Sequence, residues 1–424
     1  MKRWIRKSYF GLNLLKNRLL IQAIKLLRVF AKDAFQSGAE SLEPPRQVIK
    51  STADWMAAQS PNAQFTGHYI QVDQPCELVR TNQPQTGDAS PHPQFAADKV
   101  AHLSGSFVAV IPHGRVWGEY GAIVTEDNTL LADLSIYRLQ NSIGYHRVFS
   151  DWHYCPVKKI EGTVANLATD SAFVYYHWIA DLLLRYGLLI KAGYTADSFD
   201  KIIIGNHAKR FQKDTLEVLG LLGAGQDKVI LTAEHPLIWA KSLVVPSYPA
   251  MGQGFHPWHM EMLRSWFLPA VKDALPTLEP NARIYVSRGQ ATYRRVMNEE
   301  AVMTLLTGYG FKVVQLETLS FLEQVALMAS AEMVVAPHGS GLTNIIFCRP
   351  GTKIIELFSP EMVGAYYWII SDLCQLDYYY TIGDRLRSEK YDHTWNASAD
   401  VLVSLDRLQK TLDLALAAST SVAS

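Results

Sequence analysis

The sequence is poor in cysteine and contains no closely spaced cysteine pair. Its four cysteines, Cys76, Cys155, Cys348 and Cys374, lie far apart and form no C-x-x-C motif. A structural zinc site or a dithiol redox centre needs neighbouring thiols, so neither is predicted. Isolated cysteines are typical of proteins whose thiols stay reduced in a cytosolic setting. We therefore expect a cytoplasmic location.

The chain also lacks a net charge, because its 424 residues include 40 Lys or Arg and 40 Asp or Glu. A neutral chain has no overall positive field to attract nucleic acid, so we predict no nucleic-acid partner. The charge is unevenly distributed, since residues 1–40 hold nine basic residues against Asp33 and Glu40, a net charge of +7. The rest of the chain therefore carries about −7.

No uncharged apolar run approaches the roughly 18 residues that a membrane-spanning helix needs, and no small-residue cleavage site follows the N-terminus. Residues 2–32 instead predict a basic amphipathic helix, with apolar residues spaced three to five apart and Lys or Arg between them. Such a helix can lie on an anionic membrane surface, or pack on this protein or on a second copy in a homo-oligomer. We weigh the two about equally, and the first places the protein at the inner face of the cytoplasmic membrane.

A chain of 424 residues is longer than one domain with a single hydrophobic core usually is, and it predicts two domains with extensions. Strand and helix patterns alternate between residues 201 and 246, which is typical of a Rossmann-like unit. Three prolines between residues 268 and 280 mark the crossing into a second α/β domain. In the first domain, His113 and Arg115 are expected at the surface. The predicted division is a basic N-terminal helix at 1–45, a first α/β domain at 46–268, a second α/β domain at 269–400, and a C-terminal helix and tail at 401–424.

The most informative stretch is residues 321–358, where helix, strand, glycine loop, helix and strand patterns follow one another. Residues 321–330 carry apolar side chains at helical spacing, and residues 333–336 form the apolar run of a buried parallel strand. Glycines after that strand let backbone N–H groups approach an anion, and the next helix adds the positive end of its dipole. In open α/β sheets, ligands bind at the carboxyl ends of the strands. The residues expected to bind a nucleotide here are His338, Gly339, Ser340, Gly341, Asn344 and Glu356.

The glycine loop and Glu356 each have an alternative explanation that does not involve a nucleotide. A single G-x-G motif is weakly specific, and a tight structural turn explains the glycine loop as well. Glu356 ends the last strand, where an acidic residue accepts hydrogen bonds from ribose hydroxyls in dinucleotide folds. Its alternative is an ion pair with a neighbour such as Arg349.

Residues 171–190 predict a helix that places His177, Asp181 and Arg185 along one stripe, at intervals of four residues. Polar groups on an otherwise apolar helix must face solvent, each other or a cleft. The pattern alone favours a hydrogen-bonded His–Asp pair without further function.

Residues 247–258 form a long segment rich in glycine, proline and aromatic residues. Such composition is typical of a cleft wall or an acceptor-binding loop. From this segment His256 and Trp258, together with Arg185 of the preceding helix, are the candidates for acceptor binding.

Three segments, in the expected order, resemble the signature of glycosyltransferase family 61. They are YYHWIADLLLRYG near residue 180, YVSR followed by Arg294, Arg295 and Asn298-Glu299, and AEMVVAPHGSGLTNIIFCRPGTKIIELF with SFLEQ before it. The likeness covers roughly residues 105–405, and an ordered match of three parts is more specific than one loop. It implies an α/β fold of the GT-B type, with two Rossmann-like domains facing a cleft, and an inverting glycosyltransferase activity.

The resemblance also assigns roles to the candidate residues. Inversion needs a general base, and either His177 or Asp181 fits, with the other as its orienting partner. Arg288 and Arg294 are the candidates for binding the diphosphate, and Arg295 is a weaker choice. The chain contains no Asp-x-Asp motif, so no metal is expected, and cations and backbone dipoles must stabilise the departing diphosphate.

The expected substrates follow from the same resemblance. The donor is a nucleotide sugar, expected to be UDP-linked, and no other cofactor is needed. The acceptor is a hydroxyl group of a glycan or a lipid-linked glycan, in capsular or exopolysaccharide assembly of the bacterial type. Family members transfer N-acetylglucosamine or pentose, so the sugar is left open.

Two other classes of protein compete with this interpretation. The His338-Gly339-Ser340-Gly341 run is similar to the HGGG oxyanion loop of esterases, but the chain lacks the G-x-S-x-G nucleophile motif that this fold requires. The second competitor is a non-catalytic nucleotide-sugar or polysaccharide-binding protein, or a scaffold held at the membrane by the basic N-terminus. Turnover of nucleotide sugars separates an enzyme from a binding protein.

Overall fold

The computed structural model describes residues 45–59, 64–88, 90–136, 146–149, 156–223, 228–250, 254–272, 282–385 and 396–420. The predicted basic helix at residues 2–32 lies outside the described residues, and with it the predicted contact with an anionic membrane. No helix within these ranges combines the length and apolarity that crossing a membrane requires.

The first half of the chain builds a ten-stranded mixed sheet whose main path runs β1-β8-β7-β6-β12-β9-β10-β11, with β5 paired to β12 and β2 paired to β5. β12, β9, β10 and β11 pair in parallel, as do β1 and β8, and the pairs of β12 with β5 and β6 are antiparallel. The Rossmann-like prediction therefore describes only one part of this sheet. The strands are β1 (Gln47–Ile49), β2 (His68–Asp73), β5 (Ser106–Pro112), β6 (Arg115–Trp117), β7 (Ala122–Val124), β8 (Thr129–Leu131), β9 (Lys158–Asn166), β10 (Lys201–Ile204), β11 (Val229–Leu231) and β12 (Leu237–Pro246).

The second half builds a five-stranded sheet of order β14-β13-β15-β16-β17, in which every pair is parallel. Each strand reads as a short apolar run because helices cover both faces of the sheet. The order reverses between β13 and β15, which makes their carboxyl ends the switch point of an open α/β sheet. The strands are β13 (Ala282–Val286), β14 (Phe311–Val314), β15 (Ala331–Pro337), β16 (Lys353–Phe358) and β17 (Asp377–Ile382). The predicted α/β class is confirmed.

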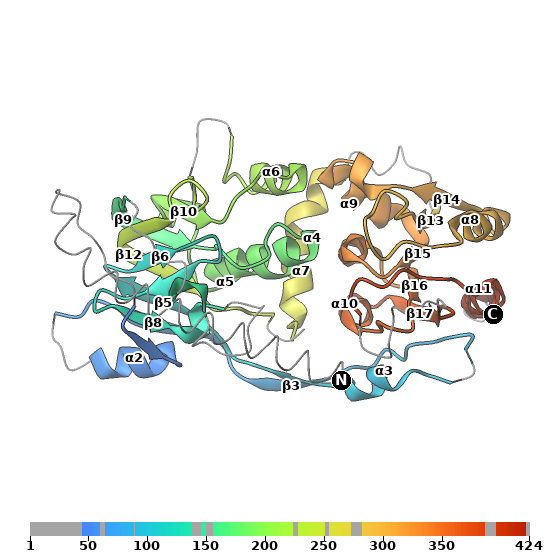
Figure 1. Cartoon of the computed structure of the whole chain (residues 1–424), viewed down its shortest axis with the longest axis horizontal. Helices are drawn as coiled ribbons and strands as arrows, with labels where there is room; N and C mark the ends of the chain where they lie inside the picture. The colour runs from blue at the N-terminus through green and yellow to red at the C-terminus, as the bar shows by residue number, and fades with distance from the viewer. Residues whose placement is uncertain are drawn as a thin grey trace, which may run out of the picture.

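The helices lie around and between the two sheets (Figure 1). The α-helices are α2 (Thr52–Gln59), α3 (Pro93–Ala97), α4 (Tyr175–His177), α5 (Leu184–Lys191), α6 (Arg210–Val218), α7 (Pro257–Phe267), α8 (Glu299–Gly308), α9 (Phe321–Ser330), α10 (Tyr366–Leu373) and α11 (Leu405–Thr420). The 3-10 helices are η1 (Ala132–Leu134), η3 (Arg147–Phe149), η5 (Ala196–Ser198), η7 (Pro269–Val271), η9 (Leu316–Thr318) and η10 (Ser340–Phe347), and η4 (Trp178–Leu183) is a π-helix. The predicted C-terminal helix is present as α11, but it begins at Leu405, and Val401 instead forms a β-bridge with Val296.

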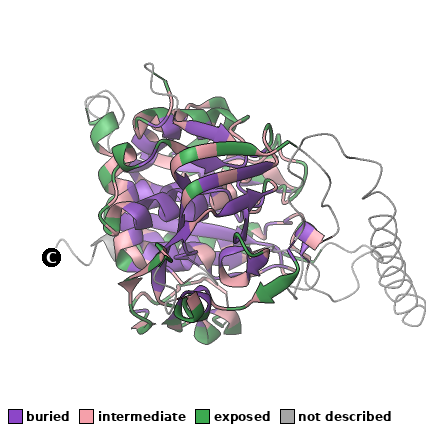
Figure 2. Ribbon diagram, turned by 90° about the vertical axis from the view of Figure 1, so that its left-hand side faces the viewer, coloured by how far each residue is buried: buried purple, intermediate pink, exposed green. Residues whose placement is uncertain are grey.

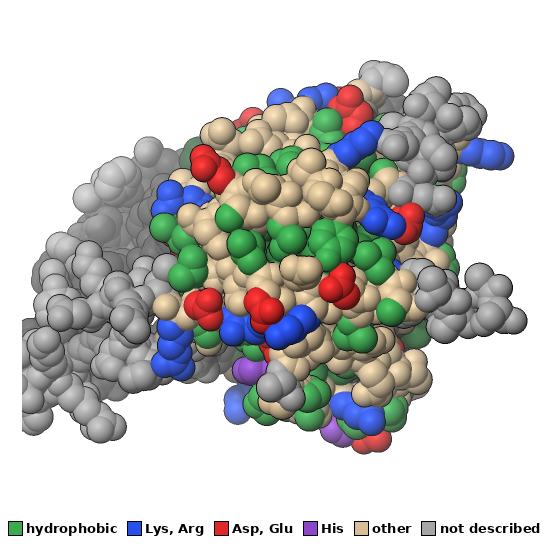
Figure 3. All heavy atoms as spheres, turned by 90° about the vertical axis from the view of Figure 1, so that its right-hand side faces the viewer, with side chains coloured by type: hydrophobic (Ala, Val, Ile, Leu, Met, Phe, Trp, Pro, Cys, Tyr) green, Lys and Arg blue, Asp and Glu red, His purple; other side chains and the backbone are tan. Residues whose placement is uncertain are grey.

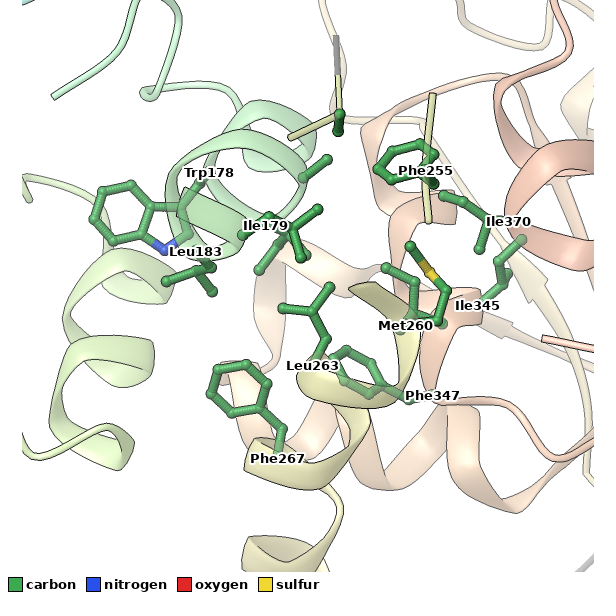
Figure 4. Close-up of a cluster of buried hydrophobic side chains, with 14 of the residues drawn as sticks. Trp178, Ile179, Leu183, Phe255, Met260, Leu263, Phe267, Ile345, Phe347 and Ile370 are labelled. Carbon is green, nitrogen blue, oxygen red and sulfur yellow. The ribbon is translucent and has the colours of Figure 1, made fainter. Parts of the chain in front are cut away.

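The largest buried cluster joins the two halves of the molecule. α7 runs between the sheets in Figure 1, and its residues pack with side chains from both sides in Figure 4. Phe267 at the end of α7 meets Phe321 of α9 edge to face, with ring centroids 4.7 Å apart. Trp178 and Ile345 belong to the same cluster. Figure 2 shows buried strands surrounded by exposed residues on the outer elements.

Residues 80–98, which the predicted division assigns to the first domain, lie on the second sheet. The backbone N–H of Asn82 donates to Asp372 of α10, at 2.8 Å, and Gln85 forms a parallel bridge with Tyr379 of β17. Phe95 of α3 packs against Trp368, with centroids 5.6 Å apart. The strands that lead into and out of this segment, β3 (Cys76–Val79) and β4 (Val100–Leu103), form a separate two-stranded sheet. The outer face of the second half carries basic and acidic side chains interspersed with hydrophobic ones (Figure 3).

Candidate active site

A cavity of about 380 Å³ opens at the switch point of the second sheet. Its walls come from the segments that follow three neighbouring strands and from the first half of the chain. The lining residues include Val286, Ser287 and Arg288 after β13, Leu316 and Glu317 after β14, Ser340 and Gly341 after β15, and Tyr175 and Phe211 from the first half. Of the residues predicted from sequence, Arg288, Ser340 and Gly341 line this cavity.

Arg288 brings positive charge to the cavity and rests against the glycine loop. A Cβ atom built on Gly339 would overlap the Arg288 guanidinium, so only glycine at this position leaves room for the present arrangement. Burial lowers the pKa of Arg288, and the like charge of Arg294 lowers it further. The Nε atom of Arg288 is buried without a hydrogen-bond partner in the described part of the chain. This guanidinium is therefore suited to receiving an anionic ligand.

Arg294 lies near Arg288, and the ring of Tyr293 is close to both guanidinium groups, with centroid distances of 5.6 Å to Arg294 and 5.8 Å to Arg288. Its backbone is left-handed, with φ 56°, and its Nε donates to the carbonyl oxygen of Ala397 at 2.5 Å. Arg295 instead pairs with Asp400 at 3.1 Å, pointing its charge away from the cavity. Arg294 and Arg288 thus remain the two candidates for the diphosphate.

Glu356 does not face a ligand. It is fully buried, and its two carboxylate oxygens hydrogen-bond to Nδ1 of His338 and to the hydroxyl of Tyr378, the latter at 2.6 Å. The predicted role in ribose binding is wrong, because this side chain points into the core below the glycine loop. The alternative pairing with Arg349 is not formed, because His338 and Tyr378 occupy the carboxylate. Glu356 instead anchors the imidazole of His338.

Asn344 is also buried and takes part in a closed network. Its Oδ1 accepts a hydrogen bond from the Tyr175 hydroxyl at 2.5 Å, and its Nδ2 donates to Gln324 at 2.9 Å and to the carbonyl oxygen of Gly341 at 3.1 Å. These bonds use the oxygen and both amide hydrogens of a fully buried side chain. Direct donor binding by Asn344 is therefore wrong, and its amide instead fixes the glycine loop to α9 and to the helix that contains Tyr175.

His177 and Asp181 form the predicted pair, with His177 Nδ1 2.7 Å from Asp181 Oδ2. The side chain of His177 is 23% exposed and that of Asp181 only 7%. Asp181 lies in the π-helix η4, a rare form whose wider turn is often found at functional sites. The ring of Tyr176 contacts His177, with centroids 5.3 Å apart.

The predicted stripe ends before Arg185, because the π-helical turn rotates this residue into the core. Arg185 is fully buried and donates to the carbonyl oxygens of Ala168 and Pro246, at 2.7 and 2.9 Å. Its guanidinium also lies 4.5 Å from the centre of the Tyr248 ring. A role in acceptor binding is therefore wrong for Arg185, which instead ties η4 and α5 to the first sheet.

An aromatic cluster connects the helix of His177 with the glycine loop. Tyr176 lies 5.9 Å from Tyr366 of α10, measured between ring centroids, and Tyr366 lies 5.8 Å from His338. Tyr367, which follows Tyr366 on α10, also contacts His338, with ring centroids 5.3 Å apart. The helix of His177 and the glycine loop thus lie on neighbouring elements that pack together. The hydrogen bond between Tyr175 and Asn344 also requires this arrangement.

Residues 175–355 match the model of the family Glycosyltransferase 61, and this range covers less than half of the chain. The matched range holds every predicted site residue except Glu356.

Several proteins to which the chain is similar are eukaryotic transferases. The chain is 31% identical over 98 residues to an EGF domain-specific O-linked N-acetylglucosamine transferase of Drosophila melanogaster, covering 22% of this chain and 19% of that protein. It is 30% identical over 104 residues to a beta-1,2-xylosyltransferase of Arabidopsis thaliana, covering 22% and 20%. It is 32% identical over 83 residues to a protein O-linked-mannose beta-1,4-N-acetylglucosaminyltransferase 2 of Takifugu rubripes, covering 19% and 14%. The matched segments span about a fifth or less of these relatives.

The two remaining acceptor candidates, His256 and Trp258, lie at the start of α7. His256 is buried at the N-terminus of this helix, where its backbone N–H donates to Nδ1 of His259 at 3.1 Å. The indole of Trp258 donates to Asp73 at 3.2 Å, and the ammonium of Lys191 lies 4.8 Å from its ring. Neither residue lines the cavity at the switch point, and acceptor binding by them stays a prediction.

The sequence did not single out Tyr175, Gln324 or Glu317, although all three line the cavity. Glu317 follows β14, so its place beside the switch point depends on the order of the strands. Tyr175 stands two residues before His177 and offered a signal, because a tyrosine beside a polar pair on an apolar helix needs a partner for its hydroxyl. In the described ranges, no group of three or more His, Cys, Asp or Glu is placed to hold a metal ion.

Proposed function

We propose that the chain is an inverting glycosyltransferase that moves a sugar from a nucleotide-sugar donor to a hydroxyl group of a glycan or lipid-linked glycan. The observation that carries this proposal is the cavity at the switch point. Its walls combine Arg288 and the Ser340-Gly341 loop with Tyr175, which stands on the helix of the His177–Asp181 pair. This arrangement supports a donor site in the cavity and a candidate base on the neighbouring helix.

The donor, which we propose to be UDP-linked, places its diphosphate between Arg288, Arg294 and the backbone N–H groups of the glycine loop. Two guanidinium groups and the N-terminus of η10 supply the positive potential that a departing diphosphate needs. The absence of an Asp-x-Asp motif from the sequence supports a reaction without metal. Glu317, exposed at the cavity and close enough to Arg288 to affect its pKa, replaces Glu356 as the partner of the ribose hydroxyls.

His177 is the general base in this proposal, and Asp181 orients it. The hydrogen bond to Asp181 engages Nδ1 of the imidazole, so Nε2 is the nitrogen left to take the proton of the acceptor hydroxyl. Asp181 is less exposed than His177, which suits a residue that positions the base and stabilises its charged form. The acceptor oxygen then attacks the anomeric carbon as the diphosphate leaves.

The wider setting is proposed as follows. The two halves form a GT-B-like arrangement, with the active site between a donor domain at 269–400, to which residues 80–98 are added, and an acceptor-side domain made of the rest of 46–268. The acceptor belongs to polysaccharide assembly of the capsular or exopolysaccharide type, at the cytoplasmic side of a membrane. Residues 2–32 contact that membrane or a second copy of the chain.

Two measurements test the proposed function. A donor panel of UDP-, GDP- and CMP-sugars is screened by thermal shift, where a ligand at 100 times its Kd adds about 2.7 kcal/mol to the free energy of unfolding. Turnover of the best donor is then compared among wild type, His177→Ala and Asp181→Asn. Each substitution is expected to lower kcat by about 10² or more with the fold intact.

His102→Ala is the matched control, because His102 forms a pair with Glu77 at 3.1 Å on the exposed β3–β4 sheet, away from the cavity. Its turnover should equal that of wild type. Binding without turnover of any donor would favour the non-catalytic binding protein. Wild-type rates in both His177→Ala and Asp181→Asn would remove this helix from the mechanism.

A further inference from the structure

A second cavity, of about 370 Å³, lies on the first sheet and shares no lining residue with the cavity at the switch point. Its walls come from α2, the segment that precedes β2, the end of β5 with the residue after it, and the turn between β7 and β8. Figure 1 places α2 and β8 at one end of the molecule and β13 and β14 near the other. This cavity is therefore not an extension of the proposed donor site.

The side chains that line this second cavity combine aromatic rings with neutral and acidic polar groups. Trp55 and Phe65 meet edge to face, with ring centroids 5.5 Å apart. The polar lining residues are Gln59, Gln64, Thr66, His113, Glu126 and Asp127. No Lys or Arg belongs to the lining, so the cavity offers no lysine or arginine cation to a phosphate or a nucleotide. Rings flanked by amides and carboxylates are suited to a neutral ligand rich in hydroxyl groups, which donates to the carboxylates and lays its C–H face on the rings.

The polar groups that a ligand in this cavity can reach are its carboxylates. Glu126 and Asp127 are exposed and line the cavity. Trp55 is only 5% exposed, and its Nε1 is buried without a hydrogen-bond partner among the residues that the structure describes. The indole therefore forms part of the apolar wall, and the carboxylates supply the hydrogen-bond acceptors.

The acidic side of the cavity is held rigidly from below. Arg115, expected at the surface, is 2% exposed and donates to the carbonyl oxygen of Thr125 and to Asn128, both at 2.6 Å. These bonds fix the turn that presents Glu126 and Asp127. His113 has a left-handed backbone with φ 53°, and its Nδ1 lies 3.0 Å from Glu126. Left-handed residues other than glycine are costly and cluster at binding sites, where the surrounding structure holds them in place.

We propose that this cavity is a non-catalytic subsite for a neutral oligosaccharide. The choice of a glycan over other hydroxyl-rich ligands rests on the proposed function, since a glycosyltransferase that extends a polymer gains affinity by holding the chain away from the reacting end. The half-buried ring of Phe65, backed edge to face by Trp55, packs on a sugar, and Glu126 accepts hydrogen bonds from its hydroxyls. The subsite binds the acceptor independently of the donor.

The test measures binding of neutral oligosaccharides to the full chain without any donor. Xylo-, cello- and chito-oligosaccharides of two to six units are titrated by calorimetry against wild type, Glu126→Ala and Phe65→Ala. At least one series is expected to bind wild type, and each substitution should weaken its affinity about tenfold or more. Glu234→Ala, which removes an exposed carboxylate elsewhere on the first half of the chain, is the matched control and should bind as wild type does.

Two outcomes overturn the subsite. One is the absence of binding by wild type across the whole panel, and the other is wild-type affinity in Glu126→Ala and Phe65→Ala when both are folded. Thermal shift with the nucleotide-sugar panel separates this result from the proposed function, because Glu126→Ala should keep the donor response of wild type. Oligosaccharide binding without any donor response would refute the transferase and leave the subsite standing.

Discussion

The hydroxyl of Tyr175 donates a 2.5 Å hydrogen bond to Oδ1 of Asn344, and this bond links the helix of the proposed base to the loop of the proposed donor site. Burial raises the pKa of Tyr175 above its usual value, so the hydroxyl stays protonated and donates over the working pH range. Asn344 in turn donates to Gln324 of α9 at 2.9 Å. The side chains of Tyr175, Asn344 and Gln324 thus connect three elements around the cavity through hydrogen bonds.

Tyr175→Phe tests this connection. The substitution leaves the buried Oδ1 of Asn344 without a donor, which is expected to lower the free energy of unfolding by about 1–3 kcal/mol. Urea unfolding measures the loss, and Tyr194→Phe is the control because the Tyr194 hydroxyl makes no hydrogen bond in the described part of the chain. A midpoint equal to that of Tyr194→Phe would show that the bond does not hold the two halves together.

Exchanging Glu356 and Glu317 for glutamine in separate variants distinguishes a core anchor from a ligand-binding carboxylate. Glu356→Gln breaks a buried interaction with His338 and is expected to cost roughly 3–5 kcal/mol of stability. Glu317 is exposed, so Glu317→Gln should leave the unfolding midpoint unchanged and weaken donor binding about tenfold.

Chemical unfolding and a donor titration, made on both variants, give the two readouts. The prediction requires lower stability in Glu356→Gln, and weaker donor binding at unchanged stability in Glu317→Gln. Weaker donor binding in Glu356→Gln at full stability would return the ribose role to Glu356, and wild-type affinity in Glu317→Gln would exclude the replacement proposed here.

The part of the site that could be predicted from sequence is local. Helix α9 was predicted at its observed bounds, and the strand predicted at residues 333–336 appears as β15 with two extra residues at its start and one at its end. Short-range periodicity is enough for this, and the structure adds a capping box between Ser320 and Glu323 at the start of the helix. The His177–Asp181 pair follows from helical spacing in the same way.

The orientation of Glu356 and the place of Glu317 depend on long-range packing. A strand covered on both faces is apolar throughout, so its pattern does not tell which side a polar residue faces. The order β14-β13-β15 decides which strand ends meet, and no local signal fixes that order. For the same reason residues 80–98 were assigned to the first half, although their partners are in α10 and β17.

Gly339→Ala is expected to affect the donor site without affecting the fold. Its backbone is extended, with φ 173°, so any residue can adopt it, and the obstacle is the overlap between the new Cβ and the Arg288 guanidinium. The far end of a flexible side chain can move, so the substitution should displace Arg288 and weaken donor binding about tenfold, with stability changed by less than about 1 kcal/mol.

Gly308→Ala is the matched control, because a Cβ at this exposed position in α8 meets no atom within 4 Å. It should bind the donor as wild type does and gain about 0.5–1 kcal/mol of stability from the better helix propensity of alanine. Equal donor affinities for Gly339→Ala and Gly308→Ala would mean that the position of Arg288 does not matter for binding.

His259 is expected to make the fold sensitive to acid. Burial, and then the nearby charge of His256, lower the pKa of His259 to about 3, well below the value near 6.5 of an exposed imidazole. Between these values the unfolded chain binds one more proton than the folded chain, so stability falls as the pH falls, by about 1.4 kcal/mol per pH unit. Asp73 acts in the opposite direction on the same group.

His259→Asn isolates this contribution, because the asparagine Oδ1 can accept the backbone N–H of His256 that Nδ1 of His259 accepts now, at 3.1 Å. Urea midpoints of both proteins are measured from pH 7 to pH 4. The free energy of unfolding should fall less steeply in the variant, with the difference growing as the pH drops below 6.5. The exposed His102 has no such burial, so His102→Asn should follow the wild-type curve, and parallel curves for His259→Asn and wild type would assign the acid sensitivity to other groups.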